Sequence, residues 1–175
     1  MRDVIACIYS IILTGILILP TIYQDSFSLV IANNPFYSMS NAKIHGVESH
    51  TSDGKLLVEL EYSPDIVKKD ELTFFKINFF DSGSKVRTRH VDCDLIIRKN
   101  ETELFTVSKQ YGETFIHSPN GILLTSFGFN ETGKYTISVE AEGLNFIPIK
   151  PVFADFSATV SKMSDGRLRI ILLPQ

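Results

Sequence analysis

Apolar and polar residues alternate with a period of two along most of the chain beyond residue 42. The clearest stretch is "GKYTISVEAEG", where Tyr135, Ile137, Val139 and Ala141 share one face and polar residues share the other. Alternation of this kind is typical of a β-strand with one buried face. The same reasoning predicts further strands in apolar runs at residues 56–62, 73–80, 122–129, 152–160 and 167–173.

Turn signals separate these runs. "SDG" occurs at residues 52–54 and 164–166, "DSGS" at 81–84 and "SPNG" at 118–121. Their residues tolerate the positive φ that tight hairpins require. Only residues 63–72 have a cap-like start, which predicts one helical turn. We therefore predict an all-β fold for residues 42–175, an antiparallel sandwich of about eight or nine strands.

One motif indicates the kind of sandwich. In "FNETGKYTISV", a turn is followed by Gly-x-Tyr and an alternating strand, as in the tyrosine corner of immunoglobulin-like domains. Tyr135 would then pack inward and return its hydroxyl to the backbone of the preceding turn. Ile137 stands where antibody domains carry a cysteine, so the immunoglobulin-like sandwich would lack that disulfide. The alternative is a tyrosine at an exposed sheet edge.

The N-terminus carries an apolar segment. Residues 4–23 contain no charge and follow Arg2 and Asp3, a pattern that predicts a hydrophobic helix. Residues 1–32 are interpreted either as a cleaved signal peptide or as a membrane anchor, followed by a turn-rich linker at residues 33–41. Either reading predicts an extracytoplasmic protein, secreted or held at the cell surface through residues 4–23.

Charge, cysteine content and short motifs limit the kinds of ligand, disulfide and modification that we expect. Residues 1–32 contain one positive and two negative charges, so removing them changes the formal net charge from −3 to −2. A near-neutral domain without a basic stripe does not favour nucleic acid. Cys7 lies in the leader, so Cys93 has no intramolecular partner. The triplet "NET" at Asn100 and at Asn130 predicts N-glycosylation of turns in an exported protein.

The stretch "RHVDCDLIIRKNET" gathers the residues most able to bind a metal ion. On a strand, Cys93 belongs to the apolar row and behaves as a small hydrophobe, whereas His90 and Asp92 lie on the other face. His90 and Cys93 therefore cannot bind one ion. His90 and Asp92 with His117, or with His50, form a candidate copper or zinc site.

The alternative for this face is a solvated strand whose carboxylates pair with Arg87, Arg89 or Arg98. The chain also lacks the catalytic patterns Gly-x-Ser-x-Gly and His-Glu-x-x-His, and it has no Gly-rich phosphate loop. We therefore expect no enzymatic activity, and no cofactor other than a copper or zinc ion at the candidate site.

A longer series of motifs resembles a known group of proteins. "RHVDCD", "IHSPNG", "GKYTISVEAEG" and "GLNFIPIKPVF" follow one another between residues 72 and 160. The series resembles exported β-sandwich proteins of ammonia-oxidising archaea, many of which are anchored to the cell surface. The resemblance implies an immunoglobulin-like sandwich outside the cytoplasmic membrane and treats His90 and His117 as motif positions. Cys93 departs from the pattern, which has an aromatic residue there.

Two functions are consistent with these features. The first is a non-enzymatic envelope module whose partner is an envelope or membrane protein or a second copy of itself. Phe146, Ile147 and Ile149 would contact that partner, unless they close one end of the sandwich. The second is a copper or zinc carrier, or an accessory subunit of a copper-dependent membrane oxidase, with His90, Asp92 and His117 as ligands.

Overall fold

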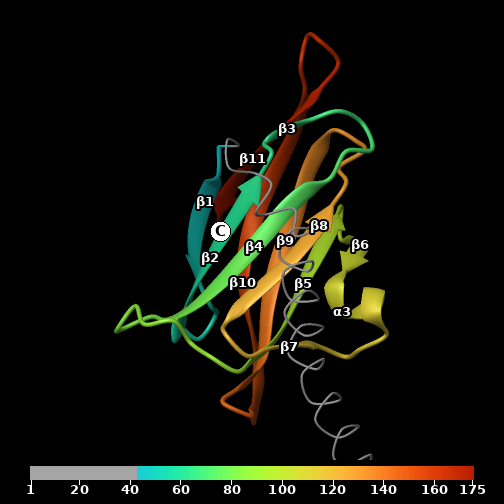
Figure 1. Ribbon diagram of the computed structural model, residues 1–175. Helices are drawn as coiled ribbons and strands as arrows, with labels where there is room; N and C mark the ends of the chain where they lie inside the picture. The colour runs from blue at the N-terminus through green and yellow to red at the C-terminus, as the bar shows by residue number, and fades with distance from the viewer. Residues whose placement is uncertain (1–42) are drawn as a thin grey trace, which may run out of the picture. The chain divides into compact units, whose positions relative to one another are not determined.

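The alternating segments form two antiparallel sheets in the computed structural model, which describes residues 43–175 (Figure 1). The first sheet has the strand order β1-β2-β4-β8. Its strands are β1 (His45–His50), β2 (Leu56–Ser63), β4 (Thr73–Asp81) and β8 (Ile122–Phe127). Consecutive partners in this sheet run antiparallel throughout.

The second sheet has the order β3-β11-β10-β9-β5-β6, and a short strand, β7, pairs with the start of β5. Its strands are β3 (Ile66–Val67), β5 (Val91–Lys99), β6 (Thr102–Thr106), β7 (Ile116–Ser118), β9 (Gly133–Leu144), β10 (Ile147–Lys162) and β11 (Leu168–Pro174). One free edge of β5 is therefore shared by β7 near its beginning and β6 near its end.

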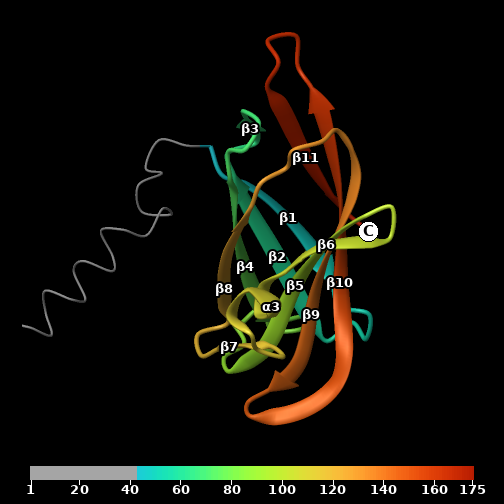
Figure 2. The same cartoon turned by 90° about the vertical axis from the view of Figure 1, so that its right-hand side faces the viewer.

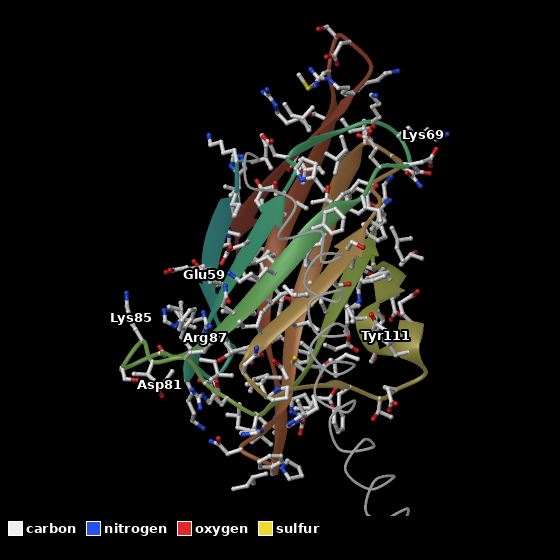
Figure 3. All side chains as sticks on the ribbon, viewed as in Figure 1. Glu59, Lys69, Asp81, Lys85, Arg87 and Tyr111 are labelled. Carbon is white, nitrogen blue, oxygen red and sulfur yellow. The ribbon has the colours of Figure 1, made fainter. Side chains whose placement is uncertain are left out.

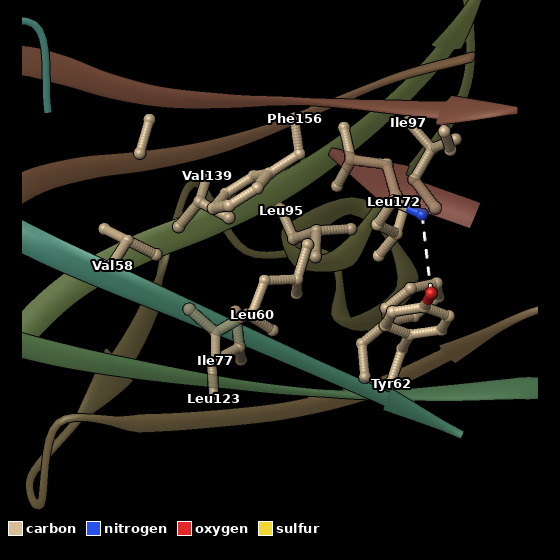
Figure 4. Close-up of a cluster of buried hydrophobic side chains, with 14 of the residues drawn as sticks. Val58, Leu60, Tyr62, Ile77, Leu95, Ile97, Leu123, Val139, Phe156 and Leu172 are labelled. Atoms are coloured by element: carbon tan, nitrogen blue, oxygen red, sulfur yellow. Dashed lines mark hydrogen bonds between the residues drawn. The ribbon is translucent and has the colours of Figure 1, made fainter. Parts of the chain in front are cut away.

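The two sheets lie face to face, and the hydrophobic core fills the space between them (Figure 2). Inward side chains from both sheets interdigitate, as Val58, Leu60 and Ile77 do with Val139 and Phe156 (Figure 4). Burying each large apolar side chain contributes about 1.5–3 kcal/mol. The core therefore supplies the stability that a disulfide-free domain of this size needs.

The prediction of an antiparallel all-β fold is confirmed, with two local corrections. Residues 43–175 contain eleven strands rather than eight or nine, because β3 and β7 are too short to show a period in the sequence. Residues 63–72 contain β3 and a turn, not a helical turn. Between residues 43 and 175 the one helix is α3 (Val107–Tyr111), which ends at Gly112 in the left-handed conformation.

Residues 1–42, with the predicted leader and linker, lie outside the described part of the chain. Residues 42–175 form a compact unit by themselves. Between residues 43 and 175, no helix combines the length and the apolar composition that crossing a bilayer requires.

Tyr135 is the third residue of β9, and its ring enters the core. Its ring packs edge-on against Phe129, with 5.1 Å between centroids, and only 4% of the residue is exposed. Its hydroxyl donates a 2.8 Å hydrogen bond to the backbone oxygen of Glu131, four residues upstream. The phenol thus connects the turn before β9 to the core.

Replacing Tyr135 by Phe keeps the ring and removes this hydrogen bond. We expect the free energy of unfolding to fall by about 1 kcal/mol, the usual net worth of such a bond. Urea unfolding followed by circular dichroism would measure it. Tyr111→Phe is the matched control because Tyr111 is 72% exposed; an equal loss in both variants would contradict a role for the Tyr135 hydroxyl.

Cys93 faces the core from β5 and is completely buried. Its thiol lies 3.6 Å from the backbone oxygen of Ile116, a weak hydrogen bond. Burial, with smaller contributions from the charges of Asp94 and Asp92, raises the pKa of the Cys93 thiol well above its usual range. The thiol therefore stays protonated and unreactive in the folded protein.

We expect a thiol reagent such as Ellman's reagent to leave Cys93 unmodified in a Cys7→Ser protein until urea unfolds the domain. Fast modification under native conditions would show that Cys93 is accessible.

The raised pKa of Cys93 also makes the stability of the domain depend on pH. Stability that is fully present below the ordinary thiol pKa should decline as the pH rises above it, because only the unfolded thiol then ionises.

Candidate functional site

Three segments that are distant in sequence meet at one end of the second sheet. They are the start of β5, the short strand β7 and the turn between β9 and β10 (Figure 1). Asp92 lies opposite His117 across the β5–β7 pair and opposite Gly143 across the β5–β9 pair. The register of β5 therefore brings an acidic residue, a histidine and the tip of a hairpin together.

His90 is the residue immediately before β5, and its backbone is fixed from both sides. Its N–H donates to the oxygen of Pro119 at 3.2 Å, and its carbonyl accepts from the N–H of Asn145 at 2.9 Å. Its φ is 49°, in the left-handed region. This conformation is uncommon for a residue with a side chain, although histidine is among the types enriched there.

His117 is oriented by Asp92. Its Nδ1 lies 2.6 Å from Oδ1 of Asp92, a short charge-assisted contact. Because a carboxylate accepts hydrogen bonds, the contact favours the tautomer of neutral His117 that carries its proton on Nδ1 and presents a lone pair at Nε2. That Nε2 lies 3.4 Å from Nδ1 of His90. Asp92 therefore contacts one nitrogen of His117, and the other nitrogen of His117 faces His90.

The distance between the two histidines matches the requirement of a metal ion. A 3.4 Å separation is long for a hydrogen bond. Two imidazole nitrogens bound to one tetrahedral ion at about 2.0–2.1 Å would lie about 3.3–3.4 Å apart. The ion would sit beside the line that joins the nitrogens, so the rings would have to turn about their Cβ–Cγ bonds until both lone pairs point at it.

Asp92 does not complete a three-residue ligand set. It contacts Nδ1 of His117, on the opposite side of that ring from His90. Between residues 43 and 175, no group of three or more His, Cys, Asp or Glu side chains could hold one metal ion. The geometry gives Asp92 the place of an outer partner that fixes a ligating imidazole, and leaves His90 and His117 as the pair of candidate ligands.

Gly143 gives Asp92 the space for this contact. A Cβ built on Gly143 would lie 3.1 Å from Cβ and 3.0 Å from Cγ of Asp92, and closer still to Oδ2. Any larger residue would push the carboxylate away from β9. The sequence contains this signal only as a glycine at the end of an alternating strand, and its partner is visible only once the register is known.

Phe146 covers the histidine pair. Its ring centroid lies 4.3 Å from that of His90 and 5.4 Å from that of His117, while 69% of the residue remains exposed. Asn145 and Phe146 form the β9–β10 turn with φ values of 50° and 65°, as a type I′ turn requires. A phenylalanine is strained in this position, so its stacking on the two imidazoles offsets a local cost.

The apolar residues of the β9–β10 hairpin differ in how far they are exposed. Ile147 is 65% exposed, whereas Ile149 is half-buried and packs against the core. Phe146 belongs to the histidine cluster rather than to a continuous apolar surface with Ile149.

Asp94, also on the polar face of β5, is not exposed to solvent as it would be on a solvated strand. Asp94 is only 3% exposed because α3 covers it, and it accepts hydrogen bonds from the N–H and the hydroxyl of Ser108. No ion pair within residues 43–175 joins Asp92 or Asp94 to Arg87, Arg89 or Arg98.

The remaining sequence candidates lie elsewhere. His50 lies on β1 in the other sheet, with its Nδ1 3.0 Å from the hydroxyl of Ser82. Asn100 and Asn130 are both exposed next to turns. The side-chain oxygen of Asn130 accepts from the N–H of Asp70 at 3.2 Å.

Comparison with known proteins adds no relative. No protein-family model matches the chain, and no curated protein or solved structure matches it. The function must therefore be argued from the geometry of the cluster itself.

Gly143→Ala should displace the carboxylate of Asp92 and release His117. We expect the proton of neutral His117 to move from Nδ1 toward Nε2, and the free energy of unfolding to fall by about 1–3 kcal/mol from overpacking. Long-range ¹H–¹⁵N spectra of the imidazoles report the tautomer. Gly46→Ala is the control, since a Cβ there meets nothing closer than 3.9 Å. An unchanged His117 tautomer in Gly143→Ala would contradict the role of Gly143.

Proposed function

We propose that this chain is a non-enzymatic, exported binding module that holds a divalent transition-metal ion between His90 and His117. The observation that supports this most directly is the 3.4 Å separation of Nδ1 of His90 and Nε2 of His117. The orientation of His117 by Asp92 adds to it, because metal-ligating histidines commonly donate their other N–H to a carboxylate.

Imidazole ligands favour copper and zinc over magnesium or calcium. Between these two, Cu²⁺ should bind more tightly at equal geometry, following the general order of divalent metal affinities. A pair of protein ligands leaves coordination positions for water or for a ligand from another molecule. Structural zinc sites are usually closed by four protein ligands, so the open pair fits a carrier or an accessory subunit better than a structural site.

Binding rather than catalysis is favoured by the surroundings of the pair. Within residues 43–175, no serine, threonine or cysteine side chain is hydrogen-bonded to His90 or His117. The series of Asp92 and the two imidazoles therefore has no adjacent nucleophile to activate. Cys93, the nearest thiol along the chain, faces the core on the opposite side of β5.

We further propose that the sandwich is a variant of the immunoglobulin-like fold. Strands β5, β9 and β10 are adjacent, as strands C, F and G are in that fold. The hydroxyl of Tyr135 returns to the backbone of Glu131, in the turn before β9, as in a tyrosine corner. The variant differs in two respects: β4 lies between β2 and β8, and β11 extends the sheet beyond β10.

The proposal of export rests on the sequence. The charge-free segment at residues 4–23 supports delivery to the outer face of the cytoplasmic membrane, and the resemblance to archaeal surface proteins agrees with it. A partner envelope or membrane protein, or a second copy of the chain, would reach the metal past Phe146 and Ile147. Both side chains are more than half exposed.

The metal site can be tested by titrating the purified, metal-free protein with Cu²⁺ and with Zn²⁺ and measuring binding by calorimetry. We expect one ion per chain. His90→Ala and His117→Ala should each abolish stoichiometric binding. Asp92→Asn should weaken it by about 10–100-fold, the usual cost of losing an outer-shell partner.

His50→Ala provides the matched control, because His50 is an exposed histidine on the other sheet. Its metal affinity should equal that of the unaltered protein. Absence of stoichiometric binding, or an equal loss in His50→Ala, would overturn the proposed function. Circular dichroism of each variant separates loss of a ligand from loss of the fold.

A further inference from the structure

A hollow adjoins the histidine pair on the side of His90. It is lined by Val86, Arg87, Arg89, His90, Pro119 and Asn120. This lining contains two guanidinium groups, an imidazole and a side-chain amide, and no carboxylate. In a chain with a formal net charge of −3, two arginines without an acidic residue in the same lining make this hollow locally positive.

The walls of the hollow are tied together by backbone hydrogen bonds. The N–H of Thr88 donates to the oxygen of Phe79 at 2.9 Å, and the N–H of Phe79 donates to the oxygen of Gly121 at 3.1 Å. Farther along, the N–H of His90 donates to the oxygen of Pro119 at 3.2 Å. The segment that carries the arginines and the turn that carries Asn120 are therefore held at a fixed separation.

Gly121 is the residue that permits this close approach. Its φ is 68°, and a Cβ there would lie 3.0 Å from the carbonyl carbon of Thr88 and closer still to the oxygen. The "SPNG" turn thus needs glycine both for its conformation and for its contact with the opposite wall.

The two arginines are not neutralised by neighbours. Arg87 lies beside the turn formed by Asp81 and Lys85 (Figure 3), with its guanidinium 5.6 Å from the centroid of the Phe80 ring. Within residues 43–175, neither Arg87 nor Arg89 forms an ion pair, whereas Arg167 pairs with Asp165 at 2.7 Å. Their charge is therefore available to a ligand.

Asn120 also lines the hollow. Its Oδ1 accepts from the N–H of Ile122 at 3.2 Å, which fixes the amide and leaves its NH₂ group to donate elsewhere. On the opposite wall, Nδ1 of His90 faces His117, and its Nε2 makes no hydrogen bond within residues 43–175. Arginine, histidine and asparagine side chains thus line one hollow whose lining contains no acidic residue.

We propose that this hollow binds a doubly charged tetrahedral oxyanion of the phosphate or sulfate class. A planar guanidinium offers parallel N–H donors that match two oxygens of such an anion. Two guanidiniums match its two negative charges, and the Asn120 amide and His90 can take the remaining oxygens. A monocarboxylate has one charge and two oxygens, so it would leave half of these donors without a partner.

This site goes beyond the proposed metal site and does not require it. The two share His90, but no hydrogen bond joins the side chain of Arg87, Arg89 or Asn120 to the two imidazole nitrogens of the proposed metal site. Phosphate binding can therefore be measured on protein freed of metal, where failure of the metal proposal has no effect on the result.

The test is an NMR titration of the metal-free protein with inorganic phosphate at constant ionic strength, with sulfate, acetate and chloride in parallel. Phosphate and sulfate should produce saturable shifts of the Asn120 side-chain amide. Arg89→Gln and Arg87→Gln should each weaken phosphate binding about tenfold, the loss expected for one charge-assisted pair. Arg169→Gln, which removes an exposed arginine from β11, should leave it unchanged.

Three results would overturn the proposal. Chloride could reproduce the phosphate response, acetate could bind as tightly as phosphate, or Arg169→Gln could weaken binding as much as Arg89→Gln. His117→Ala separates the two sites: it should abolish metal binding and retain phosphate binding. Arg89→Gln should weaken phosphate binding and retain metal binding. The ¹H–¹⁵N spectrum of each variant verifies its fold.

Discussion

The register of β5 against β9 is the constraint on which the site depends. The two strands pair regularly from Cys93 onward, but a bulge between Asp92 and Cys93 shifts the pairing so that Asp92 meets Gly143. Without the shift, Asp92 would face Glu142, and two carboxylates would lie opposite each other on a sheet, which is destabilising. The bulge exchanges an acidic neighbour for a glycine whose missing Cβ leaves room for the Asp92 carboxylate.

Carboxylates are crowded elsewhere on this face of the sheet, and the pKa of one of them shows the cost. Asp94 and Glu140 are direct partners in the β5–β9 ladder. Burial, followed by the charges of Glu142 and Asp94, raises the pKa of Glu140 above its usual range. Asp94 is buried beneath α3, where the N–H and the hydroxyl of Ser108 donate hydrogen bonds that offset the cost of burying its carboxylate. Helix α3 thus allows an acidic residue to remain in the middle of β5.

The sequence predicts the parts of this structure that depend on local period. Tyr135 and Cys93 could be assigned to the core row from alternation alone, because a strand places every second residue on the same face. β7 could not be predicted, because three residues cannot display a period. Its pairing with β5 places His117 beside Asp92, so the central contact of the site rests on a non-local register.

Phe146 and Gly143 were visible in the sequence but not interpretable from it. An Asn-Phe pair is an unusual centre for a type I′ turn, which favours Asn-Gly, and nothing local explains the choice. The explanation lies on another strand, in the two imidazoles that the Phe146 ring covers. Similarly, residues 63–72 have the local signals of a helix start, and pairing of Ile66 and Val67 with β11 overrides them.

The two ends of the imidazole pair formed by His117 and His90 lie next to side chains of opposite charge. Asp92 lies at one end of the imidazole series and the guanidiniums of Arg87 and Arg89 border the other end, beyond His90. A metal ion between the two imidazoles would withdraw electron density from His90 and make its Nε2–H a stronger donor to an anion in the hollow. The bound anion would in turn help to balance the charge of the metal. Because such coupling is reciprocal, each ligand would increase the affinity for the other by the same factor, and the imidazole of His90 would be the physical link between them.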